Sequence, residues 1–298
     1  MQNFEINSNQ IDKIKKITAK EKNFRIKNLE LFKAAGFPNK SLEDWKFSDF
    51  KHIVDRNFEE LDTKIVSSDI NKINLLKDFE HNYILLVNGD LHSSNFDFEE
   101  KSKIKINSYD KSVDYKISKN PLVCLNHALA ENGYSLEIDK NYKFKKVLVI
   151  YNFFTKDVKN KILNSKNKIK VNENAELHVI EYTINESKSK FINNVYENII
   201  LEKNSKFKNL FIQNNKSDGF FHKFSKSKLS LNSDYSNLIF SSGLKFNKLD
   251  IECDLVEENS KCNILSALFL KKNEHQEIKT LVNHLAPNCK SNQKVKNV

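Results

Sequence analysis

The chain has 298 residues, enough for one large or two ordinary domains, and its 22 Phe and 9 Tyr supply too much apolar surface for a disordered protein. The net charge of +10 and the pI of about 9.1 would permit a nucleic-acid or anionic-membrane partner. However, lysines alternate with Asp, Glu and Asn in stretches such as KSKLSLNSD, a pattern typical of a solvated sheet face, and the chain carries no recognisable nucleic-acid-binding motif. We therefore expect neither a nucleic-acid nor a membrane partner.

The cysteines and the amino terminus indicate the compartment. Four cysteines lie far apart without a C-x-x-C pair, which argues against a dense disulfide framework and a zinc ribbon: Cys124, Cys253, Cys262 and Cys289. The amino terminus lacks an apolar targeting segment, and no window approaches the 18 or so apolar residues of a membrane span. The protein is expected to be cytoplasmic and reduced.

Residues 1–80 are predicted to form an amino-terminal helical region. Apolar residues at helical spacing fill Ile11–Ala35, and Gly36 marks the end of that helix. Ser41, followed by acidic residues, is predicted to cap a second short helix. That helix carries Trp45, the only tryptophan, which we expect to be a packed anchor between helix and core.

The next part of the chain changes from linker to strand. Residues 55–80 are polar and mixed, with a hint of a short element between Ile65 and Leu76. YILLVNGDLHSSNFDF, which starts at Tyr83, predicts two strands joined by an Asn-Gly-Asp turn. A helix is expected over 121–133 with Gly133 as its C-cap, followed by the strands LEID and VLVIYNFF.

From about Ile169 onward the sequence repeats itself. Alternating apolar and polar residues open each segment, with an Asn- or Ser-rich turn soon after; the starts are Val171, Leu201, Leu231 and Val256, with a looser one at Leu281. Similar strands at a period of 25 or 30 residues predict a solenoid whose coils present the same inward side chains. We expect a mainly β protein with a right-handed parallel β-helix over 81–298; an antiparallel sandwich is the alternative.

Two motifs at opposite ends resemble the SufB/SufD family of iron–sulfur cluster assembly scaffolds. FKAAGFPNKSLEDWKFSDF resembles the family's amino-terminal signature, held here by Gly36, Pro38, Glu43, Trp45, Lys46, Phe47, Ser48 and Asp49. HLAPNCKSNQKVK resembles a later run, held by His284, Pro287, Ser291, Gln293 and Lys296. VNGDLHSS, with Asn88, Gly89 and Leu91, and the helix before the repeats also resemble the SufD branch. The order of these motifs favours SufD over SufB.

The resemblance implies a scaffold that pairs with a SufB-like subunit and works with a SufC-like ATPase. No firmly bound cofactor is implied; an iron–sulfur cluster or iron would be carried transiently. Family members usually continue with a Cys-Ser-His motif and a helical domain that docks SufC, and no positions here match them. We therefore expect a truncated or partial chain whose last coil lacks a cap, and an uncapped strand edge would lead to self-association.

Motifs for catalysis are absent from the sequence. There is no G-x-x-x-x-G-K-[ST], no H-E-x-x-H and no G-x-S-x-G, and 5 glycines leave little for a phosphate cradle. The chain is therefore predicted to be a non-catalytic scaffold, with ATP hydrolysis in the SufC-like partner. Two other classes stay open: a β-solenoid binding or structural protein unrelated to iron, and a β-helix carbohydrate-active enzyme, which would need clustered carboxylates along one coil face.

His284 and Cys289 are the candidate metal ligands, because imidazole and thiolate suit iron and both lie in the later family motif. The alternative is that His284 bonds a turn backbone and Cys289 fills a coil interior. Cys253 and Cys262 flank one predicted turn, where inward packing is favoured over facing each other. His127 is expected to be a core or boundary histidine. The remaining histidines show no informative spacing: His52, His81, His92, His178, His222 and His275.

Overall fold

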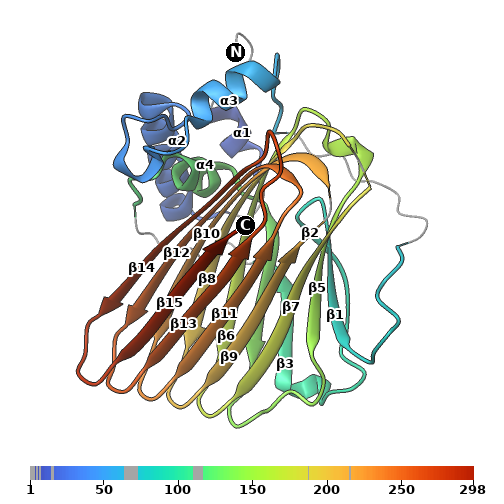
Figure 1. The fold of residues 1–298 in the computed structure, drawn as a ribbon, viewed down its shortest axis with the longest axis vertical. Coiled ribbons are helices and arrows are strands. Elements are labelled where there is room, and N and C mark those ends of the chain that lie inside the picture. Colours follow the sequence, from blue (N-terminus) through green and yellow to red (C-terminus); the bar gives the residue numbers. More distant parts are fainter. Residues whose placement is uncertain are drawn as a thin grey trace.

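The protein is a two-sheeted β-solenoid with helices packed against one of its sheets (Figure 1). The computed structural model describes residues 4, 6, 8–14, 17–63, 73–109, 117–186, 188–214 and 216–298. Parallel strands form about six coils. The predicted parallel β-helix is thus confirmed, and the antiparallel sandwich is wrong.

In the described residues the helical segments all precede Lys159, and only strands and turns follow. The helical segments are α1 (Ser8–Asp12), α2 (Ala19–Ala35), η1 (Glu43–Trp45), α3 (Phe50–Asn57), η2 (Lys101–Lys103), α4 (Pro121–Leu129) and η3 (Lys156–Val158). The strands are β1 (Asn82–Val87), β2 (Asp90–Asn95), β3 (Ile104–Ser108), β4 (Asn132–Ile138), β5 (Leu148–Phe154), β6 (Ile162–Val171), β7 (Glu176–Asn185), β8 (Ile192–Leu201), β9 (Lys206–Gln213), β10 (Ser217–Leu229), β11 (Asp234–Ser241), β12 (Leu244–Leu255), β13 (Lys261–Leu268), β14 (His275–His284) and β15 (Lys290–Asn297).

Each coil contributes one strand to each sheet. The sheet with the order β14-β12-β10-β8-β6-β4-β3 is called the covered sheet, because the helices pack on it. The sheet with the order β15-β13-β11-β9-β7-β5-β1-β2 is called the open sheet. Successive strands are parallel from β4 and β5 onward, whereas the predicted β1–β2 hairpin and the β3–β4 pair are antiparallel. The strands predicted from LEID and VLVIYNFF therefore form the first coil.

Turns at one edge of the solenoid are built on asparagines in the left-handed conformation. Six of them have φ between 56° and 60°: Asn141, Asn174, Asn204, Asn232, Asn259 and Asn288. Asn tolerates this region better than most residues, which explains how a chain with so few glycines turns so often. The side-chain amides also join neighbouring coils, because Asn174 donates to Asn141, Asn204 to Asn174 and Asn232 to Asn204 at 2.8 to 3.1 Å.

The repeat was predicted correctly in kind but not in register. Val171 and Leu201 are Cα partners, as predicted, but the next partners along the covered sheet are Leu229, Leu255 and His284. The coils therefore advance by 30, 28, 26 and 29 residues. The predicted starts Leu231, Val256 and Leu281 miss these positions because the turn lengths vary from coil to coil while the inward apolar residues stay in register.

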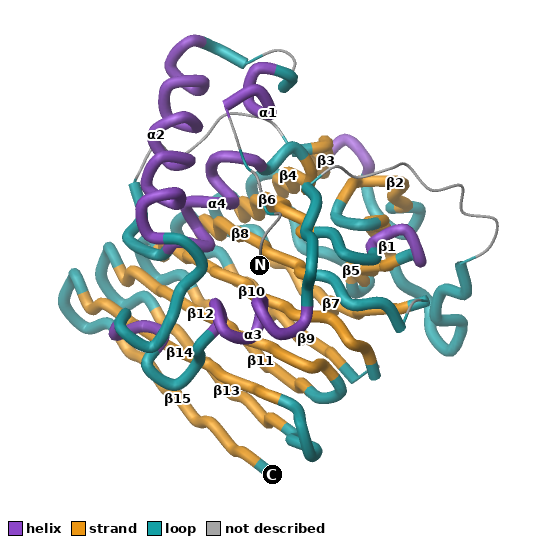
Figure 2. Tube along the Cα trace, turned by 90° about the horizontal axis from the view of Figure 1, so that it is seen from above, coloured by secondary structure: helices purple, strands orange, loops and turns teal. Residues whose placement is uncertain are grey.

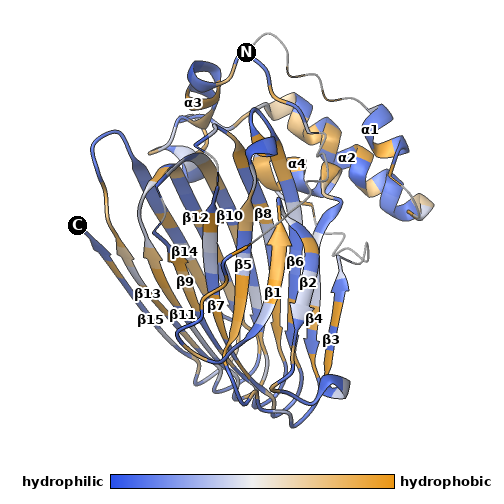
Figure 3. Ribbon diagram, turned by 90° about the vertical axis from the view of Figure 1, so that its right-hand side faces the viewer, coloured by the Kyte–Doolittle hydropathy of each residue, from blue (hydrophilic) through white to orange (hydrophobic). Residues whose placement is uncertain are grey.

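The interior of the solenoid, called the lumen here, holds the largest apolar core. Inward residues from both sheets stack in layers, including Leu177, Leu229, Leu255 and Tyr235. Figure 3 shows hydrophobic colouring along almost all of β1 and hydrophilic colouring at the turns. Because neighbouring coils place similar side chains at the same level, burial of these rows is the main source of stability for the stack.

The helices form a second core against the covered sheet. Seen from above, α1, α2 and α4 lie together on one side of the strands (Figure 2). Their apolar residues pack with Ile162, Ile192, Phe220 and Phe246, which are the first outward residues of successive strands. The Ile11–Ala35 helix is in fact two helices, with α2 ending at Gly36 (φ 68°) as predicted.

Two predicted caps are wrong. Ser41 does not cap a helix: η1 begins after Leu42, which makes no side-chain cap, and Asp49 caps α3 instead. Gly133 is not a C-cap, because α4 ends at Leu129 and Gly133 lies in β4. A Cβ at Gly133 would come within 1.8 Å of the Lys166 carbonyl oxygen, so its role is close approach of two strands. The predicted element at 65–76 lies largely outside the described residues.

Candidate functional site

His284 and Cys289, the predicted metal ligands, lie on either side of the last turn of the solenoid. The His284 Nε2 is 2.9 Å from the Ser291 Oγ, and both side chains are exposed. The Cys289 thiol donates to the Glu257 carbonyl oxygen at 3.4 Å and lies 3.3 Å from the Ser260 Oγ. Each side chain thus has its own contacts, and within the described residues no group of three or more His, Cys, Asp or Glu is placed to hold a metal ion. Their role as ligands stays a prediction.

Cys253 and Cys262 are both buried in the lumen, as favoured from the sequence, and their thiols also face each other. The two thiols are close enough to shift each other's pKa, and both remain free thiols. The contact lowers the pKa of Cys253 and raises that of Cys262, where burial acts in the same direction. The two alternatives considered for this pair are therefore realised together.

A charged cluster lies inside the lumen, farther from the asparagine turns than the apolar layers that contain the cysteines. The Lys223 Nζ donates to both oxygens of Glu181 at 2.7 and 2.8 Å and lies 3.0 Å from Glu197. Asn209 donates to Glu181 at 2.7 Å, and Ser225 donates to Glu197 at 3.0 Å. Together these side chains line a cavity of about 20 Å³ inside the coil.

The electrostatics of this lumen cluster follow from its burial. Burial raises the pKa of Glu197 because it disfavours the carboxylate, and Lys223 opposes that shift only in part. Burial also disfavours the ammonium of Lys223, but the two carboxylates outweigh it and raise the pKa of Lys223 above its ordinary value. Lys223 is therefore a buried cation, held by two carboxylates.

A second polar row runs across the outer surface of the covered sheet, beneath the amino-terminal residues. Its members are Cα partners on successive coils: Asn164, Asn194, His222, Lys248 and Glu277. The His222 Nδ1 is 2.9 Å from the Asn194 Oδ1, and its Nε2 is 3.2 Å from a carboxylate oxygen of Asp250. The fully buried Lys248 bonds Glu277 and lies 3.3 Å from Asp250. We call this row the covered ladder.

Residues of the amino-terminal signature, Gly36 to Asp49, pack over the covered ladder. Trp45 is 0% exposed; its ring lies 5.5 Å from that of His222 and 4.9 Å from the Lys248 Nζ. The Ser48 Oγ is 2.9 Å from the His275 Nε2 and also bonds Glu277. Trp45 is thus the packed anchor that the sequence predicted, and two signature residues bind the covered ladder directly.

Glu277 is the carboxylate of the covered ladder. Burial opposes its ionisation, but hydrogen bonds from His275, Lys248 and Ser48 outweigh burial and lower its pKa to about 2. The carboxylate is therefore ionised at every pH near neutrality, and it connects the amino-terminal signature to β12 and β14.

Ser48, His275 and Glu277 do not form a catalytic triad. Serine and carboxylate both contact the same ring atom, His275 Nε2, at 2.9 and 3.3 Å. In a Ser–His–acid relay the acid instead holds the other ring nitrogen, which orients the base toward the serine. The clustered carboxylates of the lumen are also unlike those of a glycosidase, because Lys223 binds both of them inside the coil.

The other histidines have mainly structural contacts. His127 is buried against Phe24 and Tyr196, as predicted for a core histidine, but its Nδ1 has no hydrogen-bond partner, and burial lowers its pKa well below the usual value. The His81 Nε2 is 2.8 Å from the Tyr151 hydroxyl, and the His178 Nε2 is 3.4 Å from Glu176.

No sequence pattern singled out His222, which belongs to the covered ladder, or His275, which contacts Glu277 of that ladder. Each histidine contacts residues that are distant in the sequence. His222 and Asn194 are 28 residues apart, about the length of one coil, and His275 and Ser48 are 227 residues apart. The available signal was polar residues recurring at the coil period. That signal becomes visible only once the register is known.

These features define a parallel β-solenoid protein with two buried polar rows and an amino-terminal cover. Residues 153–298 match the family model for the SufBD core domain of SUF system FeS cluster assembly. This match supports the SufB/SufD family and a role in SUF iron–sulfur cluster assembly, and it contains the His284–Lys296 motif. A search of the curated proteins found no match. In the described part of the chain, no helix is both long and apolar enough to cross a membrane.

Proposed function

We propose that the protein is a SufD-like scaffold subunit of the SUF iron–sulfur cluster assembly machinery. The observation that carries this proposal is the SufBD core match over residues 153–298, which span the coils from β6 to β15. The amino-terminal signature adds support, because Trp45 and Ser48 bind the same coils. The protein would act in the cytoplasm as a non-catalytic holder of partners.

The partners in this proposal are a SufB-like subunit and a SufC-like ATPase. A β-solenoid suits such pairing because it offers a long rigid surface and strand edges to which another sheet can add. ATP hydrolysis would belong to the SufC-like partner, since this sequence has no P-loop. Iron or a cluster would be cargo, with His284 and Cys289 as its proposed contacts in this chain.

Co-expression tests the proposal. The tagged chain is produced together with the source organism's SufB and SufC homologues, and the proteins that elute with it are identified. Elution of the SufB homologue supports the scaffold assignment. Elution of neither homologue, from a chain shown by circular dichroism to be folded, contradicts it.

The same preparation tests the two proposed ligands. Iron is measured in the eluted complex of the wild type, of the His284→Ala/Cys289→Ser variant and of Cys124→Ser, whose thiol is buried in α4. The double variant is expected to lose iron while Cys124→Ser retains it. Equal iron in all three complexes would remove His284 and Cys289 from the proposal without affecting the pairing result.

A further inference from the structure

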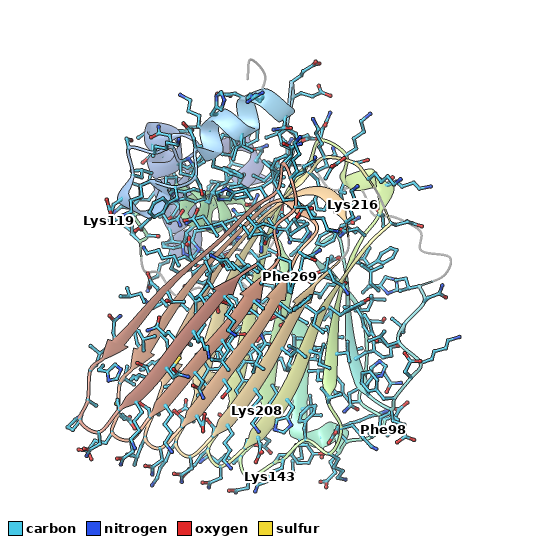
Figure 4. The ribbon with its side chains drawn as sticks, viewed as in Figure 1. Phe98, Lys119, Lys143, Lys208, Lys216 and Phe269 are labelled. Atoms are coloured by element: carbon cyan, nitrogen blue, oxygen red, sulfur yellow. The ribbon has the colours of Figure 1, made fainter. Side chains whose placement is uncertain are left out.

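The outer surface of the open sheet carries two rows of apolar side chains that continue from coil to coil. One row is Ile180, Leu210, Leu238 and Leu265, and the other is Tyr182, Ile212, Phe240 and Ala267. Leu238 is 42% exposed and Phe240 is 39% exposed. Phe269, labelled in Figure 4, is 36% exposed and extends the second row, with its ring 5.1 Å from that of Phe240. We call these residues the apolar rows.

One end of the apolar rows is already covered by a segment of this chain. Val149 and Tyr151 of β5 are the Cα partners of Ile180 and Tyr182, so both rows continue onto β5. There, Ile73, Leu75 and Leu76 pack on them, and the Leu76 N–H donates to the Tyr151 hydroxyl at 3.1 Å. This surface therefore binds an apolar peptide segment at β5, while the same rows are exposed on β11 and half-buried on β9 and β13.

Lysines surround the exposed part of the apolar rows. On the same face lie Lys208 of β9, Lys261 of β13, and Lys290, Lys294 and Lys296 of β15. Lys294 and Lys296 are the Cα partners of Leu265 and Ala267, so each row ends in a lysine. Figure 4 shows Lys208 lower on the face than Phe269.

These five lysines have no carboxylate within 4.0 Å among the described residues, whereas nearby Lys206 lies 4.0 Å from Glu176. Asp234 of β11, the Cα partner of Lys261, is on the same face, but the lysines outnumber it, so the surface combines exposed apolar side chains with an excess of positive charge. A complementary partner would present apolar side chains flanked by carboxylates.

We propose that the apolar rows on β9, β11 and β13, with their surrounding lysines, are the docking site for an acidic amphipathic segment of a partner protein. Apolar side chains of that segment cover Leu238 and Phe240, as Leu75 and Leu76 cover β5. Its carboxylates pair with Lys208, Lys294 and their neighbours. The occupant is a peptide segment rather than a lipid surface, because this chain's own segment at 73–76 occupies the same rows in that way.

A synthetic peptide pair tests this docking site on the full chain. The probe is a fluorescent amphipathic peptide of Leu and Glu, and its control has Lys in place of Glu; binding is followed by fluorescence anisotropy. The Glu peptide is expected to bind, more weakly at high salt, and the Lys peptide is not. Leu238→Ser/Phe240→Ser and Lys208→Glu/Lys294→Glu are each expected to weaken binding about tenfold or more, equal to about 1.4 kcal/mol.

Phe47→Ser is the matched control, because Phe47 is 73% exposed and lies outside the apolar rows. It should bind the Glu peptide as the wild type does, and all variants should keep the wild-type unfolding midpoint. Equal binding of the two peptides, or equal loss in all three variants, would overturn the proposal. So would binding to phosphatidylserine vesicles without peptide binding, or a wild-type dimer that Leu238→Ser/Phe240→Ser converts to a monomer.

Discussion

The lumen of the solenoid has two unlike halves on one continuous backbone. Near the asparagine turns the inward residues are apolar and recur in rows such as Val171, Leu201, Leu229 and Leu255. Further along the same strands the lumen holds Lys223 with its two glutamates. Burial of apolar surface adds directly to the free energy of unfolding. In a buried ion cluster, the attraction between the charges does little more than offset the cost of removing them from water. The apolar half therefore accounts for most of the stability, and the charged half needs another reason to be kept.

Lys223→Met should have the largest effect, because it leaves Glu181 and Glu197 buried without a cation. Removal of one partner from a buried charge cluster costs about 3–5 kcal/mol of unfolding free energy. Without Lys223 the pKa of Glu197, which burial already raises, should rise further, so the loss should shrink as the pH is lowered from 7 towards 5 and a proton binds the folded state. Urea denaturation at several pH values measures this.

The triple variant Lys223→Met/Glu181→Gln/Glu197→Gln is the control for that change. Neutral amides of similar size remove the buried charge, and most of the lost stability should return. If Lys223→Met loses the same free energy at every pH, the two glutamates are not ionised in the folded protein and the contrast between the halves of the lumen fails.

Leu201→Ala in the apolar half should cost about 2–5 kcal/mol, because Leu201 is fully buried and the neighbouring coils can close the cavity only in part. No titrating group is involved, so this loss should be the same at pH 7 and pH 5. The same urea series measures it. A pH-dependent loss would mean that the two halves of the lumen are coupled.

Glu277→Gln should have a smaller effect at the covered ladder, about 1.5–3 kcal/mol at pH 7, because hydrogen bonds to a charged group are lost. In the wild type the pKa of Glu277 is lowered from 4.5 to about 2. Its contribution is therefore present above about pH 4.5 and lost as the pH falls through about 2. The difference between variant and wild type should disappear over that range in thermal unfolding.

Asp44→Ala provides the matched control for Glu277→Gln. Asp44 pairs with Lys279 of β14 on the same side of the solenoid, but both side chains are substantially exposed. Its loss should change stability by about 0–1 kcal/mol at most. An effect as large as that of Glu277→Gln would mean that burial does not distinguish the two ion pairs.

The sequence predicted the repeat and its strands because inward apolar residues alternate, a local signal. It misplaced the later coil starts, since the connections at the other edge of the solenoid differ in length: residues 242–243 join β11 to β12, whereas residues 269–274 join β13 to β14. It missed the covered ladder because His222 contacts residues on neighbouring coils, and Ser48 contacts β14 from the amino-terminal segment. Trp45, the only tryptophan, is predicted to be an anchor, but its contact with Lys248 depends on how the amino-terminal segment crosses the coils.

The hydrogen bonds between the asparagine turns all point in the same direction along the solenoid. The side-chain amides of Asn232, Asn204 and Asn174 each donate to the Oδ1 of the asparagine one coil earlier, so the bonds from Asn232 to Asn141 run one way along the axis. A glycine could adopt the same backbone but could not form this link. If gene duplication added a coil, its turn asparagine would supply both the left-handed backbone conformation and the hydrogen bond to the neighbouring coil. The solenoid could therefore lengthen without any other change in its turns.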